Sequence, residues 1–403
     1  MTLTVLTIYD KGPRGGGTRV QVDRSIQALR MGGFTVQRLR LGRRAGESDD
    51  EDSFPLTFWP HQGLALRSRF LEKVANFKPD LVHVHGSAAS LSGVLLKALA
   101  RHRPVVVTLH DVGLFCMTGL RIFGGSSGDV CVRRAGVACW KSGCWRPPGL
   151  FGPAAAVASL SAKVAQRRAW LSQTRVVVPS RYLADLARLH GIADDRTTVV
   201  PNICSASQVP PLSPDARPHV LFVGTLSRDK GADLALEALA KLPGESWSAT
   251  FAGDGPDRTA LEMRARKMGL RHVVFAGWRE GDDLTRLREQ STVGIFPSRV
   301  VESFGLSGLE SLAAGRPVVG VARGGVSEWL RDDETGLAIP LPQPEILAGR
   351  LTELLFDGER VRRLGEQGRR LVAGHFSPEA HLRLMSSVYS DAVAFRRPER
   401  VNA

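Results

Sequence analysis

Residues 293–325 read VGIFPSRVVESFGLSGLESLAAGRPVVGVARGG, and the order of segments in this stretch recurs along the whole chain. A short apolar strand, 293–298, leads into a turn that contains Glu302. A helical segment of small and apolar residues follows, ends at Gly315, and gives way at Pro317 to a second strand. Apolar strands joined by helices are typical of a parallel sheet covered on both faces. The stretch therefore predicts an α/β protein.

The same alternation of strand and helix runs through all 403 residues. We expect about twelve strands, which are too many for one doubly wound sheet of ordinary size. The expected strands are 3–8, 34–39, 80–86, 104–110, 175–180, 197–202, 219–225, 248–255, 273–278, 293–298, 317–322 and 336–340.

The strand pattern restarts near residue 219, just after a segment, 204–218, that is rich in proline, serine and alanine. Such a composition marks a linker, and the chain is too long for one ordinary core. We predict two Rossmann-like, doubly wound domains, 1–205 and 217–375, which face each other across a cleft. A last helical run, 378–395, is expected to pack back on the first domain.

The opening stretch places two carboxylates around a helix start. Parallel sheets bind ligands beyond the carboxyl ends of their strands, and Glu302 follows such an end. The N–H groups of Gly305, Leu306 and Ser307 begin the next helix, where unpaired donors and the helix dipole favour an anion. Glu310, on the second turn, can accept hydrogen bonds from a ribose diol. The alternative is that Glu302 caps the helix and that Glu310 is solvated.

Residues 297–320 resemble the Glu-x7-Glu motif of the retaining GT-B glycosyltransferases of family 4. Other motifs stand in the order of that family and extend the resemblance over nearly the whole chain. They are PDLVHVHG (79–86), VVVTLHD (105–111), VVVPS (176–180), VPN (200–202), LFVGTLSRDKGADLALEAL (221–239), FAGDGP (251–256) and GVARGGVSEWLRDDETGL (320–337). The resemblance implies two Rossmann-like domains with a nucleotide-sugar bound between them.

The resemblance also implies roles for residues of the second domain. Glu310 would hold the ribose of the donor, and Glu302 would lie near the hydroxyls of the transferred sugar. Gly305 and Leu306 would offer N–H groups to the diphosphate, with Phe304 beside them in the donor site.

The loop GTLSRDKG, 224–231, matches a cationic element of the family incompletely. Lys230 stands at the family's lysine, whereas Thr225 stands where the family often has arginine, so Arg228 would supply the second cation. Positive charge suits this loop because the diphosphate is the leaving group and gains charge in the transition state. The alternative is a solvated loop after a strand.

Two features of the first domain point to the same site. Gly15, Gly16 and Gly17 lie between a strand and a helix without forming the GxGxxG fingerprint, which disfavours a dehydrogenase. By resemblance, Gly16 and Gly17 border the donor phosphate and the acceptor. His110 ends a strand and, by resemblance, contacts the donor sugar, although a histidine at a strand end is more often structural. His85 is a weaker candidate of the same kind.

The resemblance implies a retaining, metal-independent glycosyltransferase that uses a nucleotide-sugar of the UDP or GDP type. Glu302 and His110 are the catalytic candidates. No Asp-x-Asp metal motif follows a strand. The expected acceptor is a lipid-linked or cell-envelope glycan intermediate in bacterial polysaccharide biosynthesis. The alternatives are a nucleotide-sugar epimerase or hydrolase on the same fold, and a basic nucleic-acid-binding protein, which would leave both glutamates unexplained.

The net charge of +14 is consistent with nucleic acid, an anionic membrane surface or a phosphate-rich substrate as partner. The charge is mostly arginine and spread out, with modest clusters at 38–44, 163–168 and 360–370, and no zinc-finger or single-strand RNA signature appears. We therefore expect no nucleic acid. Lacking an 18-residue apolar run and a signal peptide, the chain is expected to be cytoplasmic, with peripheral contact at the inner face of the membrane.

An insertion at 111–150 carries four of the five cysteines: Cys116, Cys131, Cys139 and Cys144. Four thiols so close in sequence suggest a structural zinc or an iron–sulfur cluster. No Cys-x2-Cys spacing occurs, however, so free or buried thiols are an equal alternative. Disulfides are a lesser alternative, because they are rare in cytosolic proteins. Trp140 and Trp145 lie among basic residues. That combination suits a membrane interface or an acceptor pocket, or else an ordinary surface loop.

Overall fold

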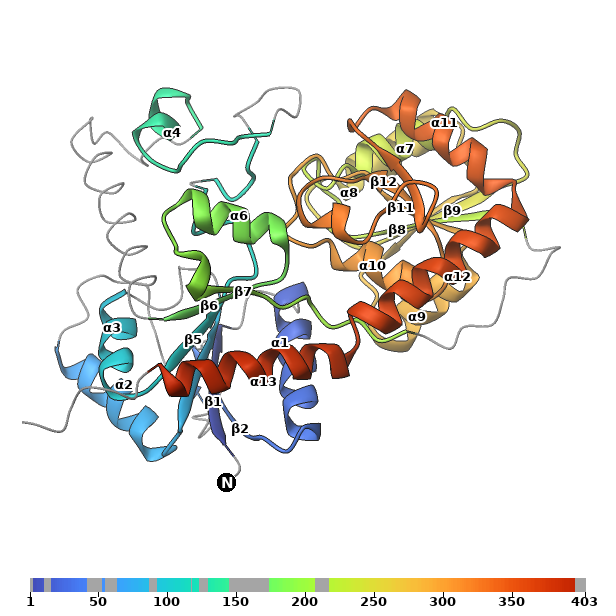
Figure 1. Ribbon diagram of the computed structural model, residues 1–403. Coiled ribbons are helices and arrows are strands. Elements are labelled where there is room, and N and C mark those ends of the chain that lie inside the picture. The colour runs from blue at the N-terminus through green and yellow to red at the C-terminus, as the bar shows by residue number, and fades with distance from the viewer. Residues whose placement is uncertain are drawn as a thin grey trace, which may run out of the picture. The chain divides into compact units, whose positions relative to one another are not determined.

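The computed structural model describes residues 3–10, 16–41, 53–54, 64–86, 93–116, 118–122, 130–144, 174–206 and 217–395. These residues form two compact units (Figure 1). The described residues of 3–122, 131–203 and 378–395 belong to the first unit, and those of 204–377 make up the body of the second.

The first unit is built on a seven-stranded sheet, in which every pairing is parallel and the order is β3-β2-β1-β4-β5-β6-β7. Its strands are β1 (Thr4–Asp10), β2 (Thr35–Leu41), β3 (Ser53–Phe54), β4 (Leu81–His85), β5 (Val105–Thr108), β6 (Arg175–Val178) and β7 (Thr197–Val199). The α-helices that lie between these strands in the sequence are α1 (Gly17–Met31), α2 (Leu64–Asn76), α3 (Gly93–His102), α4 (Val137–Lys141) and α6 (Arg181–Leu189). β4 and β5 are buried along their whole length. β5 is an unbroken run of β-branched residues, as a strand covered on both faces predicts, whereas β4 also buries His83 and His85.

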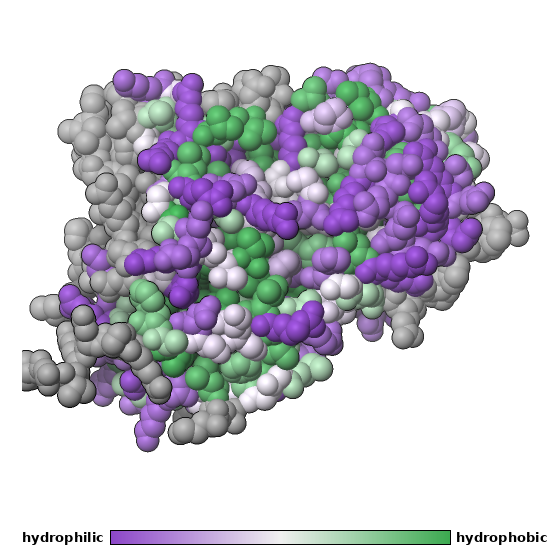
Figure 2. Space-filling view, viewed as in Figure 1, coloured by the Kyte–Doolittle hydropathy of each residue, from purple (hydrophilic) through white to green (hydrophobic). Residues whose placement is uncertain are grey.

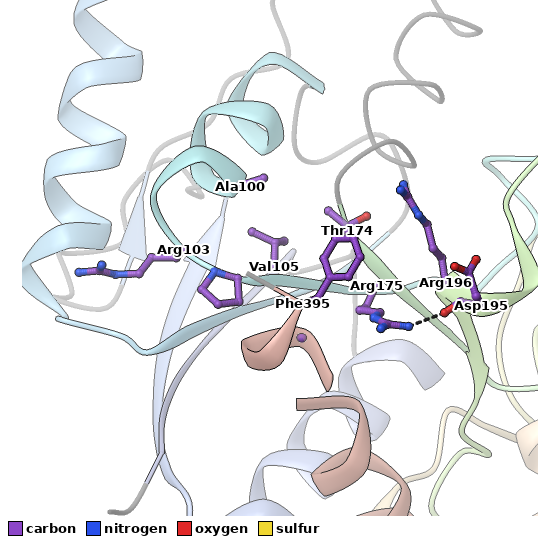
Figure 3. Close-up of a pocket in the computed structure, with 10 residues that line it drawn as sticks. Ala100, Arg103, Val105, Thr174, Arg175, Asp195, Arg196 and Phe395 are labelled. Carbon is purple, nitrogen blue, oxygen red and sulfur yellow. Dashed lines mark hydrogen bonds between the residues drawn. The ribbon is translucent and has the colours of Figure 1, made fainter. Parts of the chain in front are cut away.

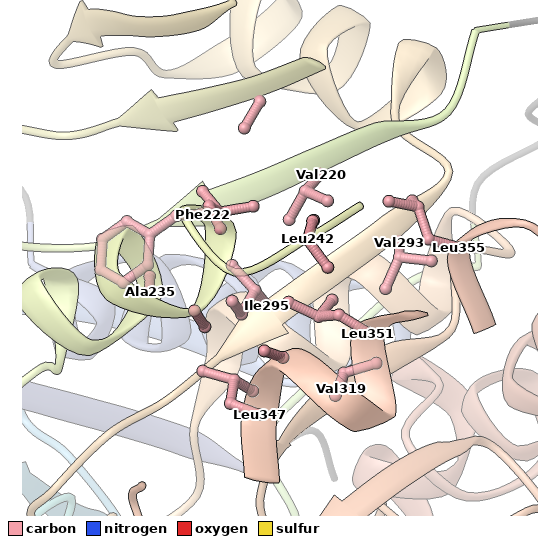
Figure 4. Close-up of a cluster of buried hydrophobic side chains, with 14 of the residues drawn as sticks. Val220, Phe222, Ala235, Leu242, Val293, Ile295, Val319, Leu347, Leu351 and Leu355 are labelled. Atoms are coloured by element: carbon pink, nitrogen blue, oxygen red, sulfur yellow. The ribbon is translucent and has the colours of Figure 1, made fainter. Parts of the chain in front are cut away.

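The second unit has a six-stranded parallel sheet in the order β10-β9-β8-β11-β12-β13. Its strands are β8 (His219–Val223), β9 (Ser248–Ala252), β10 (Val273–Gly277), β11 (Val293–Phe296), β12 (Val318–Val321) and β13 (Gly336–Ile339). Its α-helices are α7 (Ala232–Leu239), α8 (Arg258–Lys267), α9 (Gly281–Gln290), α10 (Leu306–Ala313), α11 (Pro344–Leu355) and α12 (Gly358–His375). Strand residues such as Val220 and Ile295 pack against Leu347 and Leu351 of α11 in one apolar core (Figure 4).

The last helix, α13 (Pro378–Ala394), belongs to the first unit although it follows the second in sequence. It lies beside α1 (Figure 1), and its Met385 and Tyr389 share a buried cluster with Val22 and Ile26 of that helix. The two helices pack so closely at Gly32 that a Cβ atom there would lie 2.4 Å from a side-chain carbon of Leu382. This is the helical run that the sequence predicts at 378–395.

The predicted α/β class with two doubly wound parallel sheets is confirmed, and all twelve expected strands are present. The sequence reading missed β3, which has only two residues. In each sheet the winding reverses between two central strands, β1 and β4 in the first and β8 and β11 in the second. In sheets of this kind, ligands bind beyond the carboxyl ends of the strands at this switch point. Each unit therefore has one favoured place for a site.

Candidate functional site

Glu302 lies at the switch point of the second sheet, six residues after the end of β11. Its Oε1 atom is 2.7 Å from Nζ of Lys230, which comes from the loop after β8, and it accepts a 3.0 Å hydrogen bond from the Ser298 hydroxyl. Its carbonyl accepts a hydrogen bond from the N–H of Gly325. The N-cap of α10 is Gly305, without a side-chain capping bond, so Glu302 does not cap that helix.

Lys230 is held in its charged form by this arrangement. Burial alone would lower the pKa of Lys230, but the carboxylate of Glu302, helped by Asp229, outweighs burial and leaves the pKa above its ordinary value. The side chain keeps 35% of its surface exposed. Lys230 is therefore a cation that is fixed by a carboxylate and still reachable by a ligand, as a diphosphate site requires.

The two loops at this switch point are packed directly on each other. Gly231 has φ +74°, and a Cβ atom there would lie 2.1 Å from the carbonyl oxygen of Pro297. Arg299 spans the loops, with two hydrogen bonds to the carboxylate of Asp233 at 2.5 and 2.8 Å and one to the carbonyl of Arg228 at 2.6 Å. The backbone of Arg228 is thus fixed, while its side chain is exposed. The sequence reading missed the brace formed by Arg299 and Asp233.

The start of α10 is rigid. Gly305 has φ +78°, and a Cβ atom there would crowd Phe296, Val326 and Trp329 at 3.0–3.2 Å. The indole N–H of Trp329 donates a 2.6 Å hydrogen bond to the carbonyl of Phe304. The ring of Phe304 is buried in the core, so this residue can serve a ligand only through its backbone. This packing fixes the uncapped helix start, and a helix start of this kind can bind an anion.

Glu310, on α10, forms an ion pair with Arg288 of α9. Only 18% of the Glu310 side chain and 11% of the Arg288 side chain are exposed. The pairing shows that Glu310 is not a solvated surface acid. The buried Nε atom of Arg288 has no hydrogen-bond partner among the described residues. The sequence reading did not single out Arg288.

In the first unit, the structure brings together residues from the carboxyl ends of β4 and β5. Nδ1 of His85 lies 3.0 Å from Nε2 of His110. Burial is the main cause that lowers the pKa of His110 to about 4 and that of His85 well below its usual range. Both rings are therefore neutral near pH 7. At the same switch point, Gly16 is the N-cap of α1, which begins at Gly17, whereas Gly15 lies outside the described residues.

The four clustered cysteines are not brought together as a metal site. Within the described part of the chain, no group of three or more His, Cys, Asp or Glu side chains is arranged to hold a metal ion. All four are free thiols, and Cys116 Sγ lies 3.3 Å from the Thr118 hydroxyl. Trp145 lies outside the described residues, as does the side chain of Trp140.

Much of the basic cluster at 360–370 is paired with acids. Arg360 and Arg363 both contact Asp333, at 2.9 and 3.1 Å, and Arg362 lies 3.5 Å from Glu366. Figure 2 shows a largely hydrophilic surface over α12. This face is a solvated, ion-paired surface. Among the residues that the structure describes, no helix has the length and hydropathy needed to cross a membrane.

A cavity of about 230 Å³ lies at the amino-terminal edge of the first sheet, where β5 and β6 begin (Figure 3). This is the edge opposite to the one near His85 and His110. Apolar residues such as Val105, Ala392 and Phe395 line the cavity together with Arg103, Arg175 and Arg196. Because ligands of doubly wound sheets bind at the carboxyl edge, this cavity is not the candidate site.

Comparison with known proteins assigns both halves of the chain to glycosyltransferase models. Residues 15–207 match the model described as Glycosyltransferase Family 4, and residues 206–371 match Glycosyl transferases group 1. The D-inositol 3-phosphate glycosyltransferase of Acidothermus cellulolyticus is 34% identical over 248 residues, which are 56% of this chain and 54% of that protein. The sulfoquinovosyl transferase of Arabidopsis thaliana is 25% identical over 87% of this chain and 64% of its own. The chain spans between 37% and 54% of the length of four of the curated relatives that it matches.

Solved structures share the fold over nearly the full length. Sucrose-phosphate synthase from Thermosynechococcus elongatus superposes with a TM-score of 0.71 at 21% identity, covering 98% of this chain and 100% of that one. The HepE protein of Anabaena in complex with UDP-glucose gives a TM-score of 0.70 at 17% identity, covering 96% of this chain and 99% of that one. At these identities the likeness establishes the two-domain, Rossmann-like GT-B architecture.

Proposed function

The chain is a GT-B protein of the family 4 glycosyltransferase type, and from this premise we propose that it transfers a sugar from a nucleoside diphosphate sugar to an acceptor hydroxyl with retention of configuration. The observation that carries the proposal is the pair formed by Lys230 and Glu302 at the switch point of the second sheet, near the uncapped start of α10. A fixed cation and a helix N-terminus suit a diphosphate.

In the proposed reaction, the bond between the sugar's anomeric carbon and the diphosphate oxygen breaks, and a bond to the acceptor oxygen forms on the same face. The acceptor proton passes to the departing diphosphate. Lys230, Arg228 and the N–H groups at Gly305 and Leu306 would stabilise the charge that grows on that leaving group. This charge stabilisation does the work that a metal ion does in other transferases, so the proposed reaction is independent of metal.

We assign Glu302 to the transferred sugar. Its carboxylate is shared between Lys230 and Ser298, so Glu302 can accept a hydrogen bond from a sugar hydroxyl without leaving an unpaired charge. Glu310 would take the ribose. Its ion pair with Arg288 holds the carboxylate in place for a diol. His110 would contact the sugar from the first unit, with Gly16 and Gly17 beside the phosphate and the acceptor.

The donor is proposed to be of the UDP or GDP type. A UDP-sugar is favoured by the fold neighbour whose structure is described as a complex with UDP-glucose. For the acceptor we propose a lipid-linked or cell-envelope glycan. Support comes from a relative named as a lipopolysaccharide core biosynthesis glycosyltransferase of Rhizobium meliloti, 33% identical over 43% of this chain and 52% of that protein.

The test measures release of nucleoside diphosphate from UDP-glucose, UDP-galactose, UDP-N-acetylglucosamine and GDP-mannose, with and without a panel of glycan and glycolipid acceptors. We expect one donor to be consumed faster when its acceptor is present, with a product whose anomeric configuration by NMR matches that of the donor. Acceptor-independent release would indicate a hydrolase, and an altered nucleotide-sugar without release an epimerase. An inverted product would contradict retention.

A further inference from the structure

We infer that His85 is the positioning residue for His110, and that the hydrogen bond between their rings sets the orientation of His110 and couples the tautomers of the two rings. This inference rests on the proposed function, in which His110 contacts the donor sugar. The order of the sequence motifs does not require this pairing, because the two residues lie 25 positions apart. His85 ends β4, and His110 comes two residues after the end of β5.

The geometry of the pair is restrictive. The Nδ1 atom of His85 and the Nε2 atom of His110 are 3.0 Å apart, and the rings are nearly parallel, with an interplanar angle of 21° and centroids 5.3 Å apart. His85 is 4% exposed and is fixed in register between Tyr9 of β1 and Thr108 of β5. A ring anchored in the central strand thus holds a ring at the strand tip.

A second histidine supports the first. His83 and His85 lie two positions apart on β4, so their side chains share one face of the sheet, and their ring centroids are 3.9 Å apart. His83 is itself held at both nitrogens, by the Tyr389 hydroxyl and the Thr108 hydroxyl, each at 2.7 Å. Tyr389 belongs to α13. His85 therefore has a clamped ring against one side and His110 against the other.

Because both imidazole rings are neutral, the hydrogen bond between His85 and His110 couples their tautomers. Each neutral ring has one N–H donor and one bare nitrogen acceptor. The bond between His85 and His110 uses one proton, so the tautomer of one ring dictates the tautomer of the other. Two charged rings would bring two N–H groups face to face and break the bond.

A purely structural role for His85 makes a different prediction. If His85 only fills space, a ring of similar volume without nitrogen should serve equally well, and its effect on catalysis should not depend on His110. If His85 positions His110, its loss should matter only while His110 is present. The two roles are therefore separable by substitution.

The test uses His85→Phe, which keeps the ring volume, and His85→Asn, which keeps a polar atom near the place of Nδ1. Both are made in the full chain and in a His110→Ala background. We expect His85→Phe to lower kcat by about 10- to 100-fold, since a misoriented catalytic group costs that much, with KM changed less than about threefold. His85→Asn should recover most of the rate, and His85→Phe should have no further effect in the His110→Ala background.

A second readout does not depend on activity. In protein labelled with ¹⁵N-histidine, the two ring nitrogens of His110 should report one tautomer in the wild type and a mixture in His85→Phe. Tyr389→Phe is the matched control, because it removes a hydrogen bond to His83 and leaves the bond between His85 and His110 in place, so His110 should keep a single tautomer. An unchanged His110 spectrum in His85→Phe, or an equal loss of rate with and without His110, would overturn the inference. A wild-type chain that transfers no sugar would refute the proposed function, while the spectra would still decide how His110 is held.

Discussion

Replacing Lys230 by methionine is expected to lower kcat/KM for sugar transfer by about 100- to 1,000-fold, the usual cost of removing one group that stabilises charge in a transition state. The methionine keeps most of the length of the side chain but cannot offset the negative charge of the leaving diphosphate. The loss should lie mainly in kcat, because that charge grows as the bond breaks. Steady-state kinetics with the preferred donor measures it.

The same change should leave the protein folded at a moderate cost in stability. The Lys230 side chain is 35% exposed but that of Glu302 only 16%, so the variant leaves a largely buried carboxylate without its cation, and the free energy of unfolding should fall by about 1 to 3 kcal/mol. Lys241→Met is the matched control: Lys241 pairs with Glu345 at 3.0 Å on the surface of the same unit, and its loss should leave the rate unchanged. A folded Lys230→Met variant with a rate within threefold of the wild type would remove Lys230 from the mechanism.

Acid is expected to destabilise the first unit well above the pH at which most carboxylates titrate. Burial is the main cause that lowers the pKa of His83 to about 3 and those of His110 and His381 to about 4, and it also lowers the pKa of His85. In the unfolded chain each ring has a pKa of about 6.5. Between these values the unfolded state binds more protons, so the free energy of unfolding falls as the pH drops from about 6.5 toward 4.

Each of these histidines contributes about 1.4 kcal/mol per pH unit in that window, so the first unit should lose about 4 to 6 kcal/mol at pH 5.5. Urea unfolding at a series of pH values between 8 and 5 measures this loss of stability. Hydrogen exchange of the backbone amides in β4 and β5 shows whether the loss arises in the first unit. His381→Gln should reduce the slope, whereas His102→Gln, at an exposed position, should leave it unchanged. A stability that stays constant between pH 7 and 5 would mean that these rings are not buried in neutral form.

The positions of the strands along the chain and the place of Glu302 after one of them could be predicted because they depend on local pattern. The run VGIFPS predicts a strand from its own residues alone, and the residues that follow such a strand lie at the carboxyl edge of the parallel sheet. The partners of the site residues could not be predicted. Arg288 pairs with Glu310 across 22 positions, and Lys230 with Glu302 across 72. Which side chains meet at such separations depends on the packing of helices and loops, which leaves no periodic signal.

The cysteines show the opposite case. Four thiols close in sequence suggested a cluster, but proximity along the chain does not gather side chains in space, and the described residues contain no such metal-binding group. The cleft between the two domains stays a prediction, as do the roles of the individual site residues.

The most direct test of the central claim is isothermal titration of the protein with UDP, GDP, ADP and dTDP, with NAD as the control ligand. The claim is that the switch point of the second sheet binds a nucleoside diphosphate, with Glu310 on the ribose. We expect one diphosphate to bind and NAD to fail. Glu310→Ala should abolish that binding.

Arg288→Met is the matched variant, because it breaks the same ion pair and leaves the carboxylate, so it should still bind the diphosphate, only more weakly. Equal loss in both variants would mean that the ion pair matters only for the fold and that Glu310 does not hold the ribose. No binding of any diphosphate to the wild-type protein, or binding of NAD alone, would contradict the account.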